Sequence, residues 1–357
     1  MILFFILFLI VAAIIERWSI KHSLDGVRYD ARLSAQLVEP GEEFRLITTV
    51  RNYSRRFIPF VRISEIVPRD VAVDAKKSVS GFDDAHARLN STIYMMPRQK
   101  MTRSLSVSLP RRGRYVFGGA TLFGGDFLGL SERVRYAKME REAVVLPKRI
   151  ATDDFNQALG GFMGDISVNR FILEDPVLTL GFREYTGREP MKQISWPVTA
   201  RTGRMMVKNY DHTLDVTVSV VLNIDSVIQG VDCHPYMETC YSMARSVCEM
   251  LEDKRITYAF STNAKAVNQL GPWEYVSDGL GASHLAAILE GLGRAGYVAR
   301  SSRHALMDDV RRRAESGRAH IIITPTTRDF ERYEIDQLAN YSGANVLVMT
   351  AEEVSVK

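Results

Sequence analysis

The stretch Val216-Thr217-Val218-Ser219-Val220-Val221-Leu222-Asn223-Ile224-Asp225 decides the fold of the C-terminal half of this chain. A run of β-branched residues that ends in an aspartate is typical of a strand buried on both faces. Working outward from it, the sequence predicts strands over 256–260, 319–324 and 345–349, and helices over 237–251, 284–292, 306–314 and 329–341. This alternation predicts a mainly parallel sheet with helices on both faces, over residues 211–357.

Upstream of that half, residues 24–149 alternate with a period of two. Residues 27–37 place one apolar side chain at every second position, and Pro40-Gly41 then turns the chain into another alternating run over 44–50. Short strands separated by turns, with no long helical pattern between them, are typical of an immunoglobulin-like β-sandwich. The segment 150–210 is glycine-rich and weakly periodic at its start, and we expect it to be a connector.

The N-terminus is apolar from Met1 to Ile15. Such a run covers roughly 22 Å as a helix, against about 30 Å of hydrocarbon, and extension to residue 22 predicts a short transmembrane anchor in the lipid bilayer. The alternative is a cleaved signal peptide, which ordinarily begins with basic residues that are missing here. Basic residues follow the run, so the positive-inside rule predicts a single-pass protein of the cell membrane whose soluble domains face the cytoplasm.

Composition excludes some classes of function. The chain has 357 residues, 46% hydrophobic and 25% charged, with a formal net charge of +4, and no long basic run with interleaved aromatics suggests nucleic-acid binding. Three cysteines cannot all pair with one another, which favours reduced thiols in the cytoplasm. The sequence has no GxSxG, HExxH or Walker A motif, and it predicts no cofactor and no catalytic residue.

The densest cluster of chemically distinctive residues lies in the segment 181–201. Its members combine charge with large aromatic surface: Arg183, Glu184, Tyr185, Glu189, Lys192, Trp196 and Arg201. Arg, Tyr and Trp dominate interface hot spots, so one interpretation is a partner-binding surface. The other is structural, with Trp196 packed under the sheet and with Arg201 and Glu184 tying the connector to it.

These residues resemble a motif of the bacterial family catalogued as domain of unknown function fifty-eight. In that family an Arg-Glu-Tyr segment leads through an acidic turn to a basic residue, Ile, Trp and Ala-Arg. The Arg112-Gly113-Arg114-Tyr115, Asp126-Phe127-Leu128-Gly129-Leu130 and Val144-Val145-Leu146-Pro147 segments are similar to its N-terminal half. Arg188 and Ser195 depart from the residues common there, and many relatives have two apolar segments rather than one.

The resemblance implies a membrane-anchored β-sandwich followed by a von Willebrand factor type A-like, Rossmann-like domain. It also implies a partnership with a MoxR-type AAA+ ATPase and no settled enzymatic activity. We therefore expect a non-catalytic scaffold protein that helps to assemble or mature protein complexes.

Two alternatives remain open at this stage, and both depend on Asp225. Type A domains often hold a divalent metal through Asp-x-Ser-x-Ser, but here Asp225 and Ser226 are followed by Val227 and Gln229 in the remaining metal-ligand positions, which predicts a degenerate site without metal. A metal-dependent adhesion module, or an enzyme with a site assembled near Asp225, are the alternative functions. We expect Asp225 to cap the following turn.

Two further patterns in the second half are expected to be structural. Gly291-Leu292-Gly293-Arg294-Ala295-Gly296 matches G-x-G-x-x-G, but it follows a helical pattern rather than a strand, which predicts the end of a helix instead of a dinucleotide loop. Cys233, His234, Glu238 and Cys240 suggest zinc but have no paired-ligand spacing.

Overall fold

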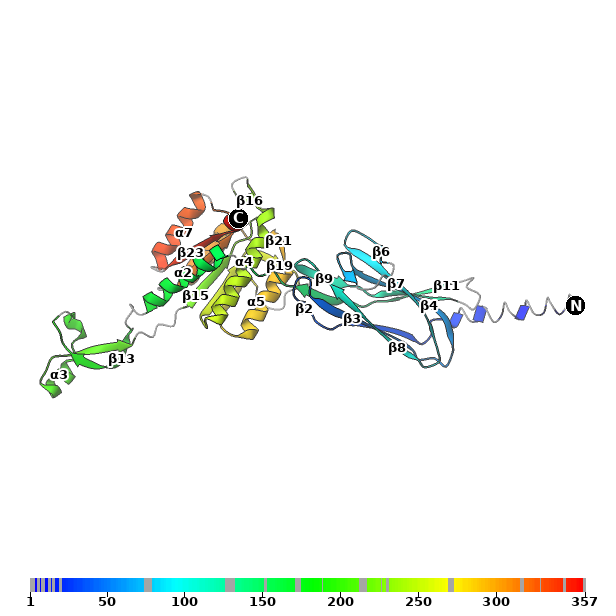
Figure 1. Ribbon diagram of the computed structural model, residues 1–357, viewed down its shortest axis with the longest axis horizontal. Helices are drawn as coiled ribbons and strands as arrows, with labels where there is room; N and C mark the ends of the chain where they lie inside the picture. Colours follow the sequence, from blue (N-terminus) through cyan, green and yellow to red (C-terminus); the bar gives the residue numbers. More distant parts are fainter. Residues whose placement is uncertain are drawn as a thin grey trace. The chain divides into compact units, whose positions relative to one another are not determined.

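The computed structural model describes residues 4, 7, 10, 11, 14, 17, 18, 21–73, 79–125, 132–150, 153–170, 175–187, 189–211, 217–225, 227–228, 231–268, 273–314, 318–327, 329–342 and 345–355. These fall into two compact units, one of residues 1–148 with 292–294, the other of residues 149–291 and 295–357. The molecule is a mixed α/β protein, with described β-sheets in both units (Figure 1).

The first unit is built from twelve described strands. They are β1 (Val27–Leu33), β2 (Leu37–Val38), β3 (Glu43–Asn52), β4 (Ile58–Pro68), β5 (Ala72–Val73), β6 (Val79–Gly81), β7 (His86–Met95), β8 (Lys100–Ser108), β9 (Gly113–Phe117), β10 (Ala120–Gly125), β11 (Glu132–Ala137) and β12 (Arg141–Val145). They form a four-stranded sheet β1-β3-β8-β5, a five-stranded sheet β11-β10-β4-β7-β6 and a three-stranded sheet β2-β12-β9.

Side chains from these sheets meet in common cores, which makes the unit a β-sandwich and confirms that expectation. Phe44 and Leu46 of the four-stranded sheet, Leu89 of the five-stranded sheet and Phe117 of the three-stranded sheet belong to one buried cluster. The period-two alternation seen in the sequence follows from this arrangement, because successive strand residues point to opposite faces.

The sandwich also buries one carboxylate, that of Glu65 in β4. Only 1% of Glu65 is exposed, yet it accepts hydrogen bonds from the Thr48 hydroxyl at 2.7 Å and the Tyr29 hydroxyl at 3.0 Å, and Arg103 pairs with it. Burial is the main cause that raises the pKa of Tyr29, and the negative charge of Glu65 is the second. The charge is tolerated because three donors from three other strands surround it.

The second unit contains a five-stranded sheet in the order β20-β18-β15-β22-β23. Its strands are β15 (Thr217–Leu222), β18 (Thr257–Thr262), β20 (Tyr275–Gly279), β22 (Ala319–Thr324) and β23 (Val346–Thr350). All neighbours are parallel except β18 and β20. Four of the five correspond to expected strands, and the antiparallel edge strand β20 was not predicted.

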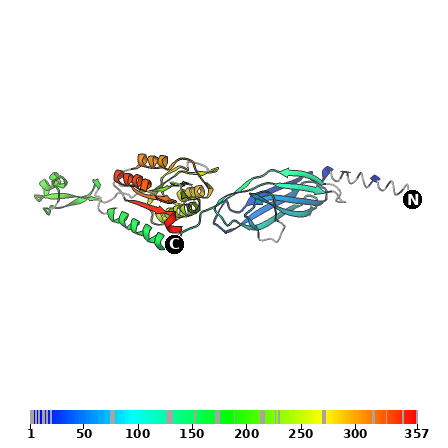
Figure 2. The ribbon, with the colours of Figure 1, turned by 90° about the horizontal axis from the view of Figure 1, so that it is seen from above.

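Helices lie on both sides of this sheet (Figure 2). Leu306 and Val310 of α6 (Arg303–Arg313) and Leu338 of α7 (Asp329–Ser342) pack with Val221 and Ile322. The helix α4 (His234–Asp253) contacts β15, β18 and β22. The remaining elements are α5 (Ala282–Arg294), α8 (Ala351–Ser355) and the paired short strands β16 (Val227–Ile228) with β17 (Val231–Asp232) and β19 (Ala264–Ala266) with β21 (Ala295–Ala299).

The expected connector is structured where it is described. Residues 153–170 form the helix α2 (Asp153–Arg170), which buries Phe155, Leu159, Phe162 and Met163. Three glycines interrupt its apolar pattern, which is why the sequence shows only weak periodicity. After it, β13 (Asp175–Glu184) and β14 (Met206–Asp211) form an antiparallel hairpin around the short helices η1 (Met191–Gln193) and α3 (Trp196–Thr202).

The N-terminal segment is described at only some positions between residues 4 and 22, all of them helical. No helix in the described part of the chain is long and apolar enough to cross a membrane. The expected anchor over residues 1–22 falls mostly on positions outside the described residues, and it stays a prediction.

Candidate functional site

The candidate site of the second unit lies where the chain changes direction across its parallel sheet. From β15 the chain continues to β18 on one side, whereas from β22 it continues to β23 on the other. In open α/β sheets, ligands bind beyond the carboxyl ends of the strands at such a switch point. Residues 223–225 after β15 and residues 324–326 at the end of β22 lie at this switch point.

A buried network of amides and hydroxyls lies at this switch point. The Asn223 amide donates to the Thr324 hydroxyl at 3.1 Å, and the Asn263 amide donates to the Asn223 side-chain oxygen at 2.9 Å. The Asn263 oxygen in turn accepts from the Ile224 backbone at 2.7 Å, and the Thr324 hydroxyl donates to the Thr326 carbonyl at 3.2 Å. Each side chain thus satisfies another, which holds the ends of three strands together.

Two described carboxylates border this network, and Glu352 is one of them, since it accepts a hydrogen bond from the Thr326 hydroxyl. Asp225 is the other; it is partly buried, and its Oδ1 lies 3.4 Å from the Asn263 amide nitrogen. The next residue, Ser226, lies outside the described residues. In the described part of the chain, no group of three or more His, Cys, Asp or Glu side chains has a metal-binding arrangement. The Asn263 amide beside Asp225 is neutral, whereas hard divalent cations favour convergent carboxylates.

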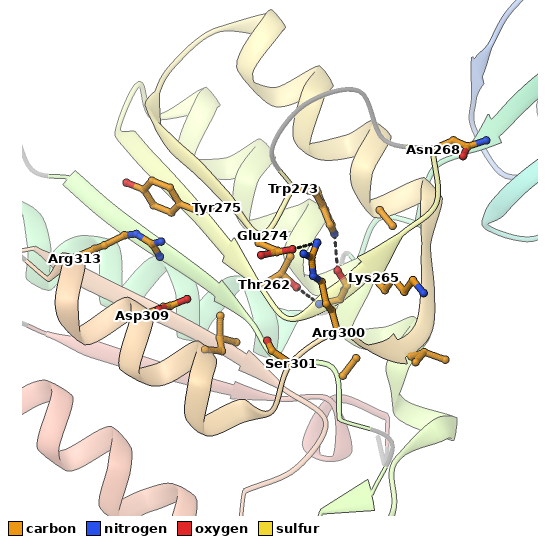
Figure 3. A pocket seen from close by; sticks show the side chains of 15 residues that line it. Thr262, Lys265, Asn268, Trp273, Glu274, Tyr275, Arg300, Ser301, Asp309 and Arg313 are labelled. Carbon is orange, nitrogen blue, oxygen red and sulfur yellow. Dashed lines mark hydrogen bonds and ion pairs between the residues drawn. The ribbon is translucent and has the colours of Figure 1, made fainter.

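A cavity of about 800 Å³ adjoins the network (Figure 3). The two are joined through Asn263, whose side chain donates to the Ser301 carbonyl at 3.3 Å and whose own carbonyl accepts from the Arg300 backbone at 2.8 Å. Trp273 lines the cavity, and its indole N–H donates to the Ala264 carbonyl at 2.9 Å. The cavity wall is therefore fixed by backbone hydrogen bonds at the ends of β18 and β21.

Charged side chains around the cavity partly neutralise one another. Arg300 forms an ion pair with Glu274, and the Arg313 guanidinium lies 4.3 Å from the centre of the Tyr275 ring. Three cationic and two anionic side chains line the cavity in all: Lys265, Arg300, Arg313, Glu274 and Asp309. Because the balance is close to neutral, the lining has no strong preference for the charge of a ligand.

The motif residues of the hairpin segment make local contacts. Arg183 pairs with Glu189, and Glu189 also accepts from the Thr186 hydroxyl at 2.8 Å and the Thr186 backbone at 3.1 Å. The hydrogen bonds from Thr186 and then Arg183 lower the pKa of Glu189 to about 2. Tyr185 joins the same turn through its backbone, which donates to the Met205 carbonyl at 2.8 Å. This turn is held by one ionised carboxylate.

The structural interpretation of Trp196 is wrong. Trp196 begins α3 and is 60% exposed, so it does not pack under a sheet. Glu184 pairs with Arg204 of the same segment at 2.6 Å, and both Arg201 and Lys192 are exposed. The residues that anchor this segment are instead Ile194 and Ser195, which are buried and bonded to β14.

The other candidate motifs have structural places. The α5 helix runs through Gly291 and Gly293 to Arg294, which confirms that the G-x-G-x-x-G pattern ends a helix. Cys233 and Cys240 are fully buried, as is Cys248, and burial raises the pKa of both Cys240 and Cys248. Raised pKa values make these thiols poor metal ligands, because zinc binds the thiolate.

Reading the sequence located Asp225 but missed its neighbours. Asn223 and Asn263 each follow a buried strand, and this repeated position is the signal that identifies them in the sequence. The cavity gives no such signal, since its lining comes from separate segments between residues 262 and 313.

Comparison with known proteins adds little to this description. No family profile and no curated protein sequence matches the chain. Among solved structures, a metal-bound CARDB domain from Pyrococcus furiosus matches with 13% identity and a TM-score of 0.23, over 34% of this chain and 90% of that one. A cohesin module from a Clostridium perfringens glycoside hydrolase matches with 9% identity and a TM-score of 0.25, over 33% and 96%. Similarity this low supports no functional conclusion.

Proposed function

We propose that this chain is a non-catalytic scaffold protein, anchored to the cell membrane by residues 1–22 with its soluble units in the cytoplasm. In this proposal the first unit is an immunoglobulin-like spacer and the second a von Willebrand factor type A-like, Rossmann-like domain. The protein works with a MoxR-type AAA+ ATPase in the assembly or maturation of protein complexes. This assignment follows the resemblance to the domain-of-unknown-function family fifty-eight.

The observation that carries the proposal is the exposed apolar surface of the hairpin segment. Trp196, Phe182, Met191 and Met205 are all more than 40% exposed within 25 residues of one another in sequence. The ion pairs Arg183–Glu189 and Arg204–Glu184 belong to the same segment. Aromatic and methionine side chains bordered by arginines are the composition of an interface core, so we assign this surface to the ATPase.

The switch-point network supports the non-catalytic part of the proposal. Asn223, Asn263 and Thr324 hydrogen-bond to one another, so their polar groups serve the sheet rather than a substrate. Two described carboxylates border the network, Asp225 beside Asn263 and Glu352 beside Thr326, and Glu352 accepts a hydrogen bond from the Thr326 hydroxyl. The amide and hydroxyl side chains at the centre of the network are not titratable groups and cannot act as a general acid or base.

The test is a membrane pull-down of the tagged full chain, comparing wild type with Trp196→Ala. We expect an AAA+ ATPase to co-purify with wild type and at least tenfold less with the variant, since truncation of a hot-spot Trp costs about 2 kcal/mol or more. Tyr136→Ala is the matched control, because Tyr136 is an exposed aromatic residue of the first unit. Thermal melts of all three proteins should coincide.

Two results would contradict the proposal. If the Trp196→Ala variant captures as much ATPase as wild type, the hairpin segment is not the binding surface. If no AAA+ ATPase co-purifies with the wild-type chain from its native membranes, the proposed partnership with such an ATPase is contradicted.

A further inference from the structure

One end of the β-sandwich gathers cations and exposed aromatic side chains. Three segments meet there: residues 21–28, 51–58 and 94–100. Strand pairing brings them together, because Arg28 lies opposite Arg51 and Arg51 lies opposite Lys100, while the Tyr53 backbone donates to the Gly26 carbonyl at 2.8 Å. We call this end the basic tip.

The charge of the basic tip is strongly one-sided. Its segments contain seven cationic residues, Lys21, Arg28, Arg51, Arg55, Arg56, Arg98 and Lys100, and one acidic residue, Asp25. Asp25 pairs with Arg133 of β11 at 2.9 Å. No described carboxylate lies within ion-pair distance of any of the seven cations. Seven unneutralised charges at one end of a small domain create a local positive field.

Apolar and aromatic side chains stand among these cations. Trp18, Tyr53, Phe57, Tyr94 and Met96 are all between 43% and 61% exposed. The Arg51 and Arg28 guanidinium groups lie 4.5 and 5.1 Å from the centre of the Tyr53 ring, and Arg56 lies 4.7 Å from that of Trp18. Stacking on a ring positions a guanidinium but leaves its N–H groups available to phosphate oxygens.

A single buried side chain fixes the shape of the basic tip. Asn52 is completely buried, and its amide donates to the Arg56 carbonyl at 2.8 Å and the Met96 carbonyl at 3.0 Å. Its oxygen accepts from the Ser54 backbone at 3.0 Å and the Ser54 hydroxyl at 2.7 Å. The loop after β3 and the loop after β7 are thus held as one surface before any ligand binds, which lowers the entropy lost on binding.

We infer that the basic tip binds the surface of an anionic lipid bilayer, with its arginines on lipid phosphates and its aromatic side chains at headgroup depth. Arginines provide the attraction to anionic headgroups, and Trp and Tyr are the residues that favour the membrane interface. The apolar N-terminal run joins the sandwich at this same end, since Trp18 contacts Arg56. The inference deepens the membrane attachment of the proposed function.

The test places an environment-sensitive fluorophore on the full chain at Pro97→Cys, in the exposed turn between β7 and β8. The natural cysteines do not compete for the label, because all three are buried. Asp70→Cys, in the turn that follows the other end of β4, is the control position. Each labelled protein is mixed with vesicles of phosphatidylcholine alone or with roughly one-third phosphatidylglycerol, which carries the anionic charge.

We expect a blue shift of the probe at position 97 with the anionic vesicles, a much smaller one with neutral vesicles, and none at position 70. Arg55→Gln with Arg98→Gln should weaken the interaction on the order of thirty-fold, at about fivefold for each charge removed. Arg69→Gln with Arg111→Gln, exposed cations outside the three segments, should leave the shift unchanged. High salt should abolish the difference between the two vesicle types.

The outcomes separate the basic tip from the anchor. The chain could float with vesicles of either charge and show no blue shift at position 97. That result would support the membrane anchor and overturn the inference about the basic tip. A charge-dependent shift without flotation on neutral vesicles would support the basic tip and contradict the anchor. A shift of equal size on both vesicle types, or one unaffected by removing Arg55 and Arg98, would overturn the inference.

Discussion

His320 is the buried residue with the clearest consequence for pH dependence. It lies in β22 with no exposed surface, and neither ring nitrogen has a hydrogen-bond partner among the described residues. Burial, and secondarily the charge of Arg318, lowers its pKa from 6.5 to about 4. The protonated imidazolium would be an unpaired charge in the centre of a parallel sheet.

This burial predicts a loss of stability in mild acid. The pKa of His320 is lower in the folded state than in the unfolded state, so at a pH between the two values only the unfolded chain binds the extra proton. The stabilisation from the neutral His320 is therefore complete above pH 6.5 and is lost as the pH falls towards 4. The loss is on the order of 3 kcal/mol. His320→Leu should reduce the fall in the melting temperature of the second unit between pH 7 and pH 4. Substitution of the exposed His234 by Gln should leave that fall unchanged. Equal pH dependence in wild type and His320→Leu would refute the assignment.

Residue-scale features could be predicted only where they depend on local sequence. The position of Asp225 at a strand end followed from the apolar run before it. Its contact with Asn263 did not, because that contact joins residues 38 positions apart and depends on the parallel register of β15 and β18. The exposure of Trp196 likewise depends on which side of α3 the rest of the segment covers.

At the scale of elements, two helices use glycine in opposite ways. In α5, a Cβ at Gly291 would come within 2.0 Å of the Trp273 ring. That ring is held by its hydrogen bond to Ala264 and lies 5.4 Å from the Phe260 ring centre, so it has little freedom to move. In α2, an added Cβ at Gly160 would meet no atom within 4 Å.

The same substitution should therefore have opposite effects in the two helices. Gly160→Ala should raise the free energy of unfolding by up to about 1 kcal/mol, since alanine favours the helix. Gly291→Ala should lower it by about 1–3 kcal/mol, because overpacking against Trp273 exceeds that gain. Denaturant unfolding of both variants would measure the difference. Stabilisation by Gly291→Ala would show that the indole moves aside easily.

Element prediction failed in a related way. Glycines at 160, 161 and 164 hid α2 because they dilute both helix propensity and apolar periodicity, although the helix still buries four large side chains on one face. The strand β20 was missed because Tyr275–Gly279 is a short edge strand with only two apolar residues at its start and no buried position. Strongly apolar strands in the middle of the sheet were predicted closely.

At the scale of the whole molecule, the two units have separate hydrophobic cores. Separate cores allow separate cooperative transitions, so calorimetry should resolve two. Glu65→Ala should lower the first unit's transition by an amount equivalent to about 3 kcal/mol, because it leaves the partly buried Arg103 without its partner. Gly291→Ala should lower only the second. A single transition that moves with both variants would contradict independent folding.

The order of the units along the chain could be read from the sequence because each has its own periodicity, two in the sandwich and strand–helix alternation after it. The sequence did not predict the cavity beside β18 and the basic tip, since each is assembled from segments that become neighbours only when strands pair.

The three tryptophans also make the chain its own optical reporter. Trp273 is 7% exposed, whereas Trp18 and Trp196 are 54% and 60% exposed, so only the last two are accessible to a dissolved quencher. Each indole belongs to a different part: the N-terminal segment, the hairpin segment and the parallel-sheet domain. Quenching of the intrinsic fluorescence therefore separates the two exposed indoles, in the N-terminal and hairpin segments, from the buried indole in the core of the second unit without any added label.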